Sequence, residues 1–315
     1  MAAAWASCAP MPSARPPGTR TPKMWRMDAG ARQERIQTNG IELSCAVAGD
    51  RGDLVVLLHG FPESAYEWRH QIPALAERFR VVAPDLRGYG ASSKPAGIAA
   101  YRPGVIADDV VGLIRAVGAD RAHVVGHDWG GAIAWRLALE HPEALERLVV
   151  INCPHPAAMA RALRTNPRQI LRSWYVLFFQ APWVPEWALR RPGALRGALR
   201  TVRPGALRDE DVAAHERAFA IPGVATAALN HYRAAFREGL RGGGTGGGRV
   251  IAAPTLLIWG DEDFALGREL AEGMERYFSG PFEIRHIPDC SHWVPEERPD
   301  LVNAWLLEFL AGPGR

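Results

Sequence analysis

The stretch Val124-Val-Gly-His-Asp-Trp-Gly-Gly131 decides the fold. An apolar run ends in it, glycines stand two residues before and two residues after Asp128, and a helical pattern begins directly afterwards. Small residues at these positions allow a sharp turn from strand to helix, which exposes the central side chain beside the first turn of the helix. We therefore predict that Asp128 occupies such a turn, as a nucleophile rather than as an ordinary helix cap.

Apolar runs alternate with helical patterns on both sides of this turn. We expect strands at 54–58, 81–83, 123–125, 148–151, 255–259 and 282–287, preceded by a hairpin over 36–48 that turns at Asn39-Gly40. Helical spacing covers residues 105–117 and 131–140. Continuous apolar strands separated by helices indicate a mostly parallel sheet with helices on both faces. The predicted class is α/β, with eight strands.

The alternation stops at Cys153 and resumes at Val250. Residues 154–240 carry helical spacing with many aromatic and arginine residues, so we expect a helical domain inserted into a core of residues 31–153 and 250–315. The glycine-rich residues 241–249 are expected to be a flexible link, because no Gly-Lys-Ser/Thr follows that would make them a phosphate loop. Residues 1–30 are predicted to be a disordered extension, with Met24 or Met27 as an alternative start.

Composition excludes several classes of protein. The chain has 315 residues, of which 48% are hydrophobic and 23% charged, as in ordinary globular proteins. A net charge of +3 does not indicate nucleic-acid binding. No apolar run approaches the roughly 20 residues that span a membrane. The four cysteines form no zinc pattern and no disulfide framework, which predicts a reducing, cytoplasmic location; they are Cys8, Cys45, Cys153 and Cys290.

A carboxylate at the turn determines the chemistry. Lipases and esterases have Ser there, so Asp128 excludes serine-type catalysis. A carboxylate is ionised near neutral pH and attacks an electrophilic carbon to form an alkyl-enzyme ester. Hydrolysis of that ester then requires a water molecule and a general base.

The base and its orienting acid are expected further along the chain, in the order nucleophile, acid, histidine. His292, after the last strand, is the predicted base, and Asp263 is its predicted partner, with Asp261 less favoured. The backbone amides of Phe61 and Trp129 are predicted to form the oxyanion hole.

Two further histidines, His59 and His127, have no partners at metal-ligand spacing. We interpret both as structural residues and expect no metal.

These motifs resemble those of the α/β-hydrolase-fold epoxide hydrolases over about residues 34–310. The matching blocks are His59-Gly-Phe-Pro-Glu-Ser64, Pro84-Asp-Leu-Arg-Gly-Tyr-Gly90, Gly126-His-Asp-Trp-Gly-Gly131 and Ser291-His-Trp293. Haloalkane dehalogenases share such blocks, so the resemblance indicates the superfamily more firmly than the reaction. It implies the α/β-hydrolase fold, with residues 154–240 as a cap domain.

The resemblance also implies two cap tyrosines that hydrogen-bond the epoxide oxygen and protonate it. Trp174-Tyr-Val-Leu-Phe-Phe-Gln180 gives Tyr175, and Asn230-His-Tyr-Arg233 gives Tyr232. An epoxide needs an acid because its alkoxide leaving group is strongly basic, whereas a halide leaves unaided. The predicted enzyme is a hydrolase of ether bonds that converts an apolar epoxide to a vicinal diol without a cofactor.

Two other functions stay open. A haloalkane or haloacid dehalogenase would use the same triad, although Phe61 stands where one dehalogenase branch has Asn and Asn152 stands where that branch has its acid. A haloacetate enzyme would have Arg in place of Trp129. A non-catalytic binder on this fold is the third interpretation.

Substrate and partners are predicted only in outline. Large aromatic side chains suggest an apolar pocket lined by Trp174, Phe178, Phe179 and Trp183. The expected partners are a small epoxide and water, with neither nucleic acid nor membrane, and the protein is expected to be a monomer or a homodimer.

Overall fold

The computed structural model describes residues 30–199, 201–243 and 248–312. Within them, eight strands form one sheet in the order β1-β2-β4-β3-β5-β6-β7-β8. The strands are β1 (Arg32–Thr38), β2 (Ile41–Ala48), β3 (Leu54–Leu58), β4 (Arg80–Pro84), β5 (Ala122–His127), β6 (Leu145–Ile151), β7 (Thr255–Gly260) and β8 (Phe282–Ile287). The pairs β1–β2 and β2–β4 are antiparallel and the other pairs are parallel, which confirms the predicted fold class.

Helices follow most of the strands. The α-helices are α1 (Gln71–Ala76), α2 (Pro103–Ala116), α3 (Trp129–Glu140), α4 (Pro156–Thr165), α5 (Pro167–Arg172), α6 (Trp174–Phe178), α7 (Val184–Leu189), α8 (Ala194–Leu199), α9 (Asp209–Phe219), α10 (Val224–Leu240), α11 (Val294–Glu297) and α12 (Pro299–Ala311). Short 3₁₀ helices are η1 (Ala65–His70), η2 (Ile98–Tyr101), η3 (Pro142–Ala144), η4 (Arg268–Ala271) and η5 (Met274–Tyr277).

The central strands are buried on both faces because their side chains alternate between two apolar clusters. In β3, Leu54, Val56 and Leu58 join the cluster that includes α2 and α3. Val55 and Leu57 join the cluster that includes α1 and α12. Both faces of a parallel strand need apolar side chains in this arrangement, so the strand reads as a continuous apolar run.

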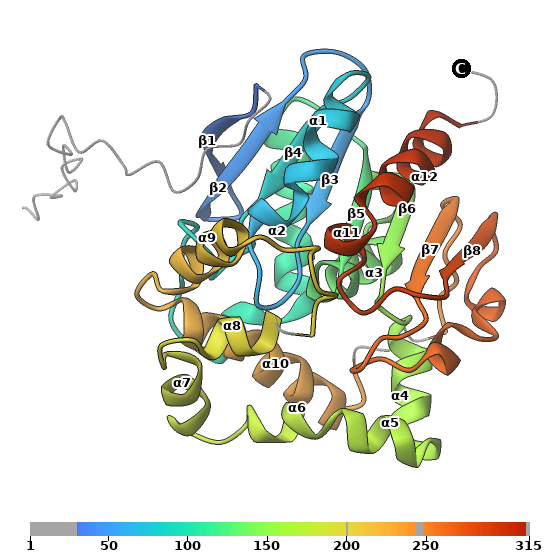
Figure 1. The fold of residues 1–315 in the computed structure, drawn as a ribbon. Helices are drawn as coiled ribbons and strands as arrows, with labels where there is room; N and C mark the ends of the chain where they lie inside the picture. The colour runs from blue at the N-terminus through green and yellow to red at the C-terminus, as the bar shows by residue number, and fades with distance from the viewer. Residues whose placement is uncertain (1–29, 200, 244–247, 313–315) are drawn as a thin grey trace, which may run out of the picture.

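Helices α4 to α10 lie between β6 and β7, and we call residues 154–240 the helical insertion. β6 and β7 are parallel neighbours in the sheet, so the chain leaves the core and returns to it at adjacent strands. In Figure 1 the insertion lies below the sheet, and β3 and β6 run toward it. Ligand sites of α/β sheets form at the carboxyl ends of the strands, which here face the insertion.

Some predictions about the chain ends and the link fall outside the described residues. These are the predicted extension, apart from Gly30, with Cys8, Met24 and Met27, and residues 244–247 of the predicted link. No helix in the described part of the chain has both the length and the apolar character to cross a membrane.

Candidate active site

Asp128 lies at a strained turn between β5 and α3. Its φ is +49°, a value uncommon for residues other than glycine. The flanking glycines permit this turn: a Cβ on Gly126 would overlap the carbonyl oxygen of Gly130, and a Cβ on Gly130 would overlap that of Leu58. The backbone therefore holds the Asp128 carboxylate out from the end of the strand, as the sequence predicted.

The two carboxylate oxygens of Asp128 have different surroundings. Oδ1 accepts a hydrogen bond of 2.8 Å from the backbone amide of Phe61. Oδ2 lies 3.5 Å from Nε2 of His292. Trp129, the other expected oxyanion donor, is the first residue of α3, directly after Asp128. The Phe61 contact therefore fixes one oxygen, and the other faces His292.

His292 is oriented by a fully hydrogen-bonded carboxylate. Its Nδ1 donates to Oδ2 of Asp263 at 2.7 Å. The same oxygen accepts from Nδ2 of Asn152 at 2.7 Å. Oδ1 of Asp263 accepts from the backbone amides of Ala265 and Leu266, each at 2.8 Å. Four donors thus fix the orientation of the Asp263 carboxylate.

Asn152 is a site residue whose role the sequence did not reveal. Besides donating to Asp263, it accepts a 2.8 Å hydrogen bond at Oδ1 from the amide of Gly260, at the end of β7. It follows β6 directly and has a φ of +41°. Its position after a buried strand was the available signal, but its partner lies 111 residues away in the chain.

Asp128 and His292 each shift the pKa of the other. Burial opposes a charge on His292, but Asp263 and the hydrogen bonds to Asp128 and Asp263 raise the pKa of His292 well above its usual range. Burial likewise opposes a charge on Asp128, but the hydrogen bond and charge of His292 leave the pKa of Asp128 below its ordinary value. These shifts favour an ionised Asp128 beside a protonated His292.

A second series of contacts connects the loop after β3 with the His292 segment. Glu67 in η1 accepts a 2.9 Å hydrogen bond at Oε2 from the amide of Gly60, and its Oε1 lies 2.9 Å from Nδ1 of His127. Nε2 of His127 donates to the carbonyl oxygen of His292 at 2.9 Å. Burial raises the pKa of Glu67 and lowers that of His127, so a neutral acid stands beside a neutral imidazole. These contacts link the backbone of Gly60 with that of His292.

The other histidine that we interpreted as structural is also fully engaged. His59 accepts a 3.0 Å hydrogen bond at Nε2 from the amide of Leu86, and its Nδ1 donates to the carbonyl oxygen of Gly60 at 2.9 Å. Burial lowers the pKa of His59 to about 3. Asp261, the less favoured acid, contacts Nδ1 of His286 at 2.5 Å. The structure thus brings Asp263, and not Asp261, to His292.

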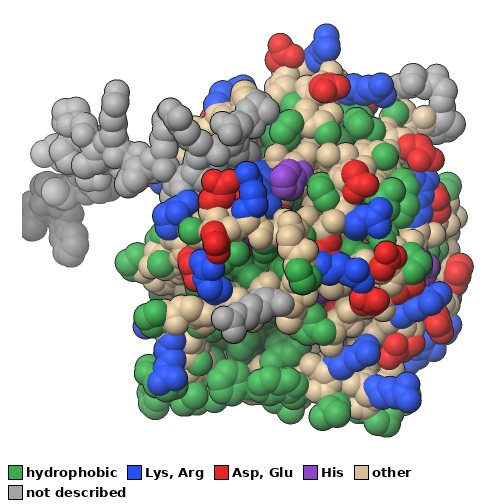
Figure 2. All heavy atoms as spheres, viewed as in Figure 1, with side chains coloured by type: hydrophobic (Ala, Val, Ile, Leu, Met, Phe, Trp, Pro, Cys, Tyr) green, Lys and Arg blue, Asp and Glu red, His purple; other side chains and the backbone are tan. Residues whose placement is uncertain are grey.

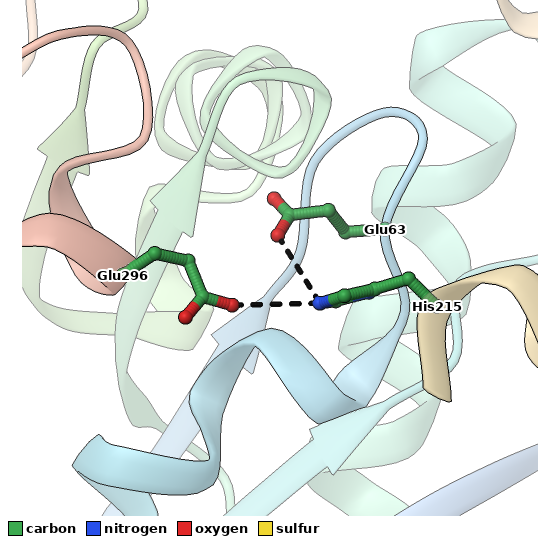
Figure 3. Close-up of side chains that lie close together, drawn as sticks. All are labelled: Glu63, His215 and Glu296. Atoms are coloured by element: carbon green, nitrogen blue, oxygen red, sulfur yellow. Dashed lines mark ion pairs between the residues drawn. The ribbon is translucent and has the colours of Figure 1, made fainter. Parts of the chain in front are cut away.

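Buried side chains of metal-ligand type also occur beside the site. Within the described residues they form two groups, Glu63–His215–Glu296 and Glu63–Glu67–His127. Figure 3 shows the His215 ring pointing between the two carboxylates, with Nε2 at 3.4 Å from Glu296 and 3.7 Å from Glu63. Arg69 already holds both oxygens of Glu296, at 2.6 and 2.5 Å. Because a guanidinium occupies the place of a cation, we interpret this cluster as ion pairing between α9 and the core.

The two tyrosines of the insertion meet near Asp128. The ring centres of Tyr175 and Tyr232 are 6.0 Å apart, and Tyr232 packs edge-on against Phe61 at 5.2 Å and Trp129 at 4.8 Å. Burial, with the charge of Asp128 as the next cause, raises the pKa of both phenols. Both hydroxyls therefore keep their protons at neutral pH.

The expected pocket residues divide into two pairs. Phe179 is buried and packs against Phe61, Tyr175 and Tyr232, and Phe178 packs on Phe179. Trp174 and Trp183 are 62% and 82% exposed. The structure therefore brings the two phenylalanines to the site and places the two tryptophans on the surface: Trp174 lies with Leu177 on the exposed side of α6, and Trp183 lies just before α7.

Known proteins resemble this chain over most of its length. The alpha/beta hydrolase fold family matches residues 53–299. AB hydrolase superfamily protein YfhM of Bacillus subtilis is 43% identical over 89% of this chain and 98% of its own length. Epoxide hydrolase A of Mycobacterium tuberculosis is 36% identical over 90% of this chain and 98% of its own. The crystal structure of Bacillus megaterium epoxide hydrolase with an inhibitor superposes with a TM-score of 0.80, at 31% identity, over 88% of this chain and all of that one.

Proposed function

The chain belongs to the α/β-hydrolase-fold epoxide hydrolase family, and from that premise we propose that it converts an apolar epoxide to a vicinal diol through a covalent ester on Asp128. One observation carries the proposal. The Asp128 carboxylate has one oxygen held by the Phe61 amide and the other 3.5 Å from Nε2 of His292, close to the paired rings of Tyr175 and Tyr232.

In the first step, Oδ2 of Asp128 attacks an epoxide carbon and the carbon–oxygen bond breaks. Tyr175 or Tyr232 gives its proton to the departing alkoxide, so the product is a hydroxyalkyl ester and a tyrosinate. Raised phenol pKa values suit this role, because the tyrosines stay protonated until the strongly basic alkoxide develops.

Ester formation also prepares the base. It removes the negative charge of Asp128, one of the causes that raise the pKa of His292. His292 therefore becomes more acidic once the ester exists, and its proton restores the tyrosinate to a phenol. This transfer leaves a neutral imidazole, so the base is free only when an ester is present.

In the second step, neutral His292 takes a proton from water, and the resulting hydroxide attacks the ester carbon of Asp128. The Phe61 amide, 2.8 Å from Oδ1, faces the oxygen on which negative charge develops; one such donor contributes roughly 3 kcal/mol in comparable sites. Release of the diol regenerates the carboxylate and the protonated histidine. Atoms and protons balance without a cofactor.

We propose that the helical insertion acts as the cap of this site. It contributes Tyr175 from α6 and Tyr232 from α10, and Phe179 next to both. Arg233, next to Tyr232, donates to the carbonyl oxygens of Phe179 and Ala181 at 2.9 and 2.8 Å, which ties α10 to the segment after α6. This contact holds the two tyrosines in one geometry.

The test of the covalent route is a single-turnover reaction in ¹⁸O-water. Because water attacks the ester carbon, the first turnover is expected to place ¹⁸O in the Asp128 carboxylate, as read by peptide mass spectrometry. Label that enters only the diol would show direct attack of water on the epoxide. Activity is also expected to survive treatment with a chelator.

A further inference from the structure

The outer face of the helical insertion is unusually apolar. Of the eleven large hydrophobic side chains that are exposed in the described residues, eight lie between Leu163 and Trp187. We define the outer face as the exposed residues between Arg161 and Arg191. Its most exposed apolar members are Leu171, Trp174, Leu177, Trp183, Val184 and Trp187. Figure 2 shows hydrophobic side chains gathered along the lower edge of the molecule, where Figure 1 places α5, α6 and α7.

The amount of exposed apolar surface is large for a monomer. With about 250 Å² for a whole side chain, the three tryptophans alone expose on the order of 500 Å². This equals the largest apolar patch on typical monomers, about 300–600 Å², before any leucine is added. An open hollow of about 710 Å³ also lies in this face, lined in part by Trp183, Trp187, Arg190 and Arg191.

The same face is strongly positive. Six exposed arginines border the apolar residues: Arg161, Arg164, Arg168, Arg172, Arg190 and Arg191. None of them forms an ion pair within the part of the chain that the structure describes. The one acidic residue between 154 and 208 is Glu186, which is buried and paired with Arg233 at 2.6 Å. The outer face therefore presents six guanidinium groups, and one partly exposed carboxylate lies at its border: Glu269 accepts a 2.9 Å hydrogen bond from Nδ2 of Asn166, and the charges of Arg172 and Arg168 help to lower its pKa.

We propose that this face binds the surface of an anionic lipid bilayer. Indole rings favour the level of the lipid headgroups, leucine side chains favour the hydrocarbon below it, and arginines are attracted to anionic headgroups. Peripheral binding of this kind needs no membrane-spanning helix.

Two other occupants fit the face less well. A symmetric contact with a second copy would bring two arginine-rich, strongly positive faces together. A single-stranded nucleic acid would use arginines and indole rings, but it offers nothing to Leu171, which is 75% exposed, or to Leu177.

The experiment measures co-sedimentation of the full chain with vesicles. Phosphatidylcholine vesicles that contain phosphatidylglycerol are compared with pure phosphatidylcholine vesicles, at low and high salt. We expect binding to the anionic vesicles only, weakened by salt, with a blue shift of tryptophan fluorescence.

Two variants separate the contributions. Arg161→Gln/Arg168→Gln is expected to weaken vesicle binding about 25-fold, at about fivefold for each arginine near an anionic surface. Trp183→Asn/Leu171→Gln removes the two most exposed apolar side chains and is expected to reduce the fluorescence shift, since Trp174 and Trp187 remain, and to weaken binding at least tenfold. The matched control is Leu240→Gln, which changes a residue that is 74% exposed outside the outer face and should bind as the parent does.

Failure of this proposal is distinguishable from failure of the proposed function, because turnover of a water-soluble epoxide should be the same in all these variants. Absence of binding to anionic vesicles would overturn the proposal. So would a dimer in sedimentation velocity that Trp183→Asn/Leu171→Gln dissociates, or tighter binding to a single-stranded oligonucleotide than to the vesicles.

Discussion

Replacing Asp263 by Asn should stop the proposed reaction at the ester. Oδ2 of Asp263 accepts from Nδ1 of His292 and from Nδ2 of Asn152, both at 2.7 Å. Oδ1 accepts from two backbone amides, so the new amide group would have to stand at the Oδ2 position and face two donors. Asn152 cannot simply turn, because its Oδ1 already holds the amide of Gly260.

The size of the effect follows from these contacts. Each lost hydrogen bond to a charged acceptor contributes about 1.5–3 kcal/mol, so two contribute about 3–6 kcal/mol. His292 would also change tautomer to pair with the new amide, which places its proton on Nε2, the atom that must accept one from water. At about 1.4 kcal/mol per tenfold change in rate, ester hydrolysis should slow by about 10² to 10⁴. Alkylation of Asp128 should continue.

Rapid quenching followed by intact-protein mass spectrometry measures both steps. The Asp263→Asn enzyme is expected to gain the mass of one epoxide within the first turnover and to keep it. Asp261→Asn is the matched control, since Asp261 follows the same strand but contacts His286 instead of His292. Normal turnover by Asp263→Asn, or trapping of the ester by Asp261→Asn, would refute the assignment of the acid.

Three further outcomes are expected. His292→Gln should also accumulate the ester, whereas Asp128→Ala should form no adduct in the same mass measurement. Tyr175→Phe/Tyr232→Phe should lose nearly all epoxide opening in a diol assay, and the control Tyr101→Phe should lose none. A double variant that still opens epoxides would contradict the role of the tyrosines. Haloalkane turnover that persists in the double variant would indicate a dehalogenase. Because the pKa of Asp128 is lowered, Asp128 stays ionised as pH falls through the usual carboxyl range, so alkylation should continue. Ester hydrolysis needs neutral His292 and should slow with acid. Single-turnover pH profiles in which both steps fail together would contradict this.

The core of the fold was predictable because its signals are local. Most buried strands contain a continuous apolar run. The observed bounds differ from the expected ones by no more than a few residues, as in β6, which begins at Leu145 rather than at 148. The extra residues at its start, Glu146 and Arg147, are polar and only partly buried, so they lack the apolar pattern of a central strand.

Contacts between distant segments were not predictable in the same way. Asp128, Asp263 and His292 each follow a strand, so topology alone places them at one edge of the sheet. The pairing of Asn152 with Asp263, and that of His215 with Glu63 and Glu296, depends on side-chain directions that no local pattern encodes. The exposure of Trp174 was not predicted for a similar reason. From the sequence alone, an aromatic residue in a short helix can equally line a pocket or face the solvent.

Because β6 and β7 are neighbours in the sheet, the core and the helical insertion can change independently in evolution, and each carries one part of the proposed chemistry. A chain that exits and re-enters a sheet at neighbouring strands can exchange the whole intervening segment without changing the register of either strand. The core would then keep Asp128, Asp263 and His292 and continue to cleave esters, while a new insertion, with other groups in place of Tyr175 and Tyr232, would redirect the enzyme to a different electrophile. Selection and protein engineering can therefore act on the choice of leaving group separately from the hydrolytic half of the cycle.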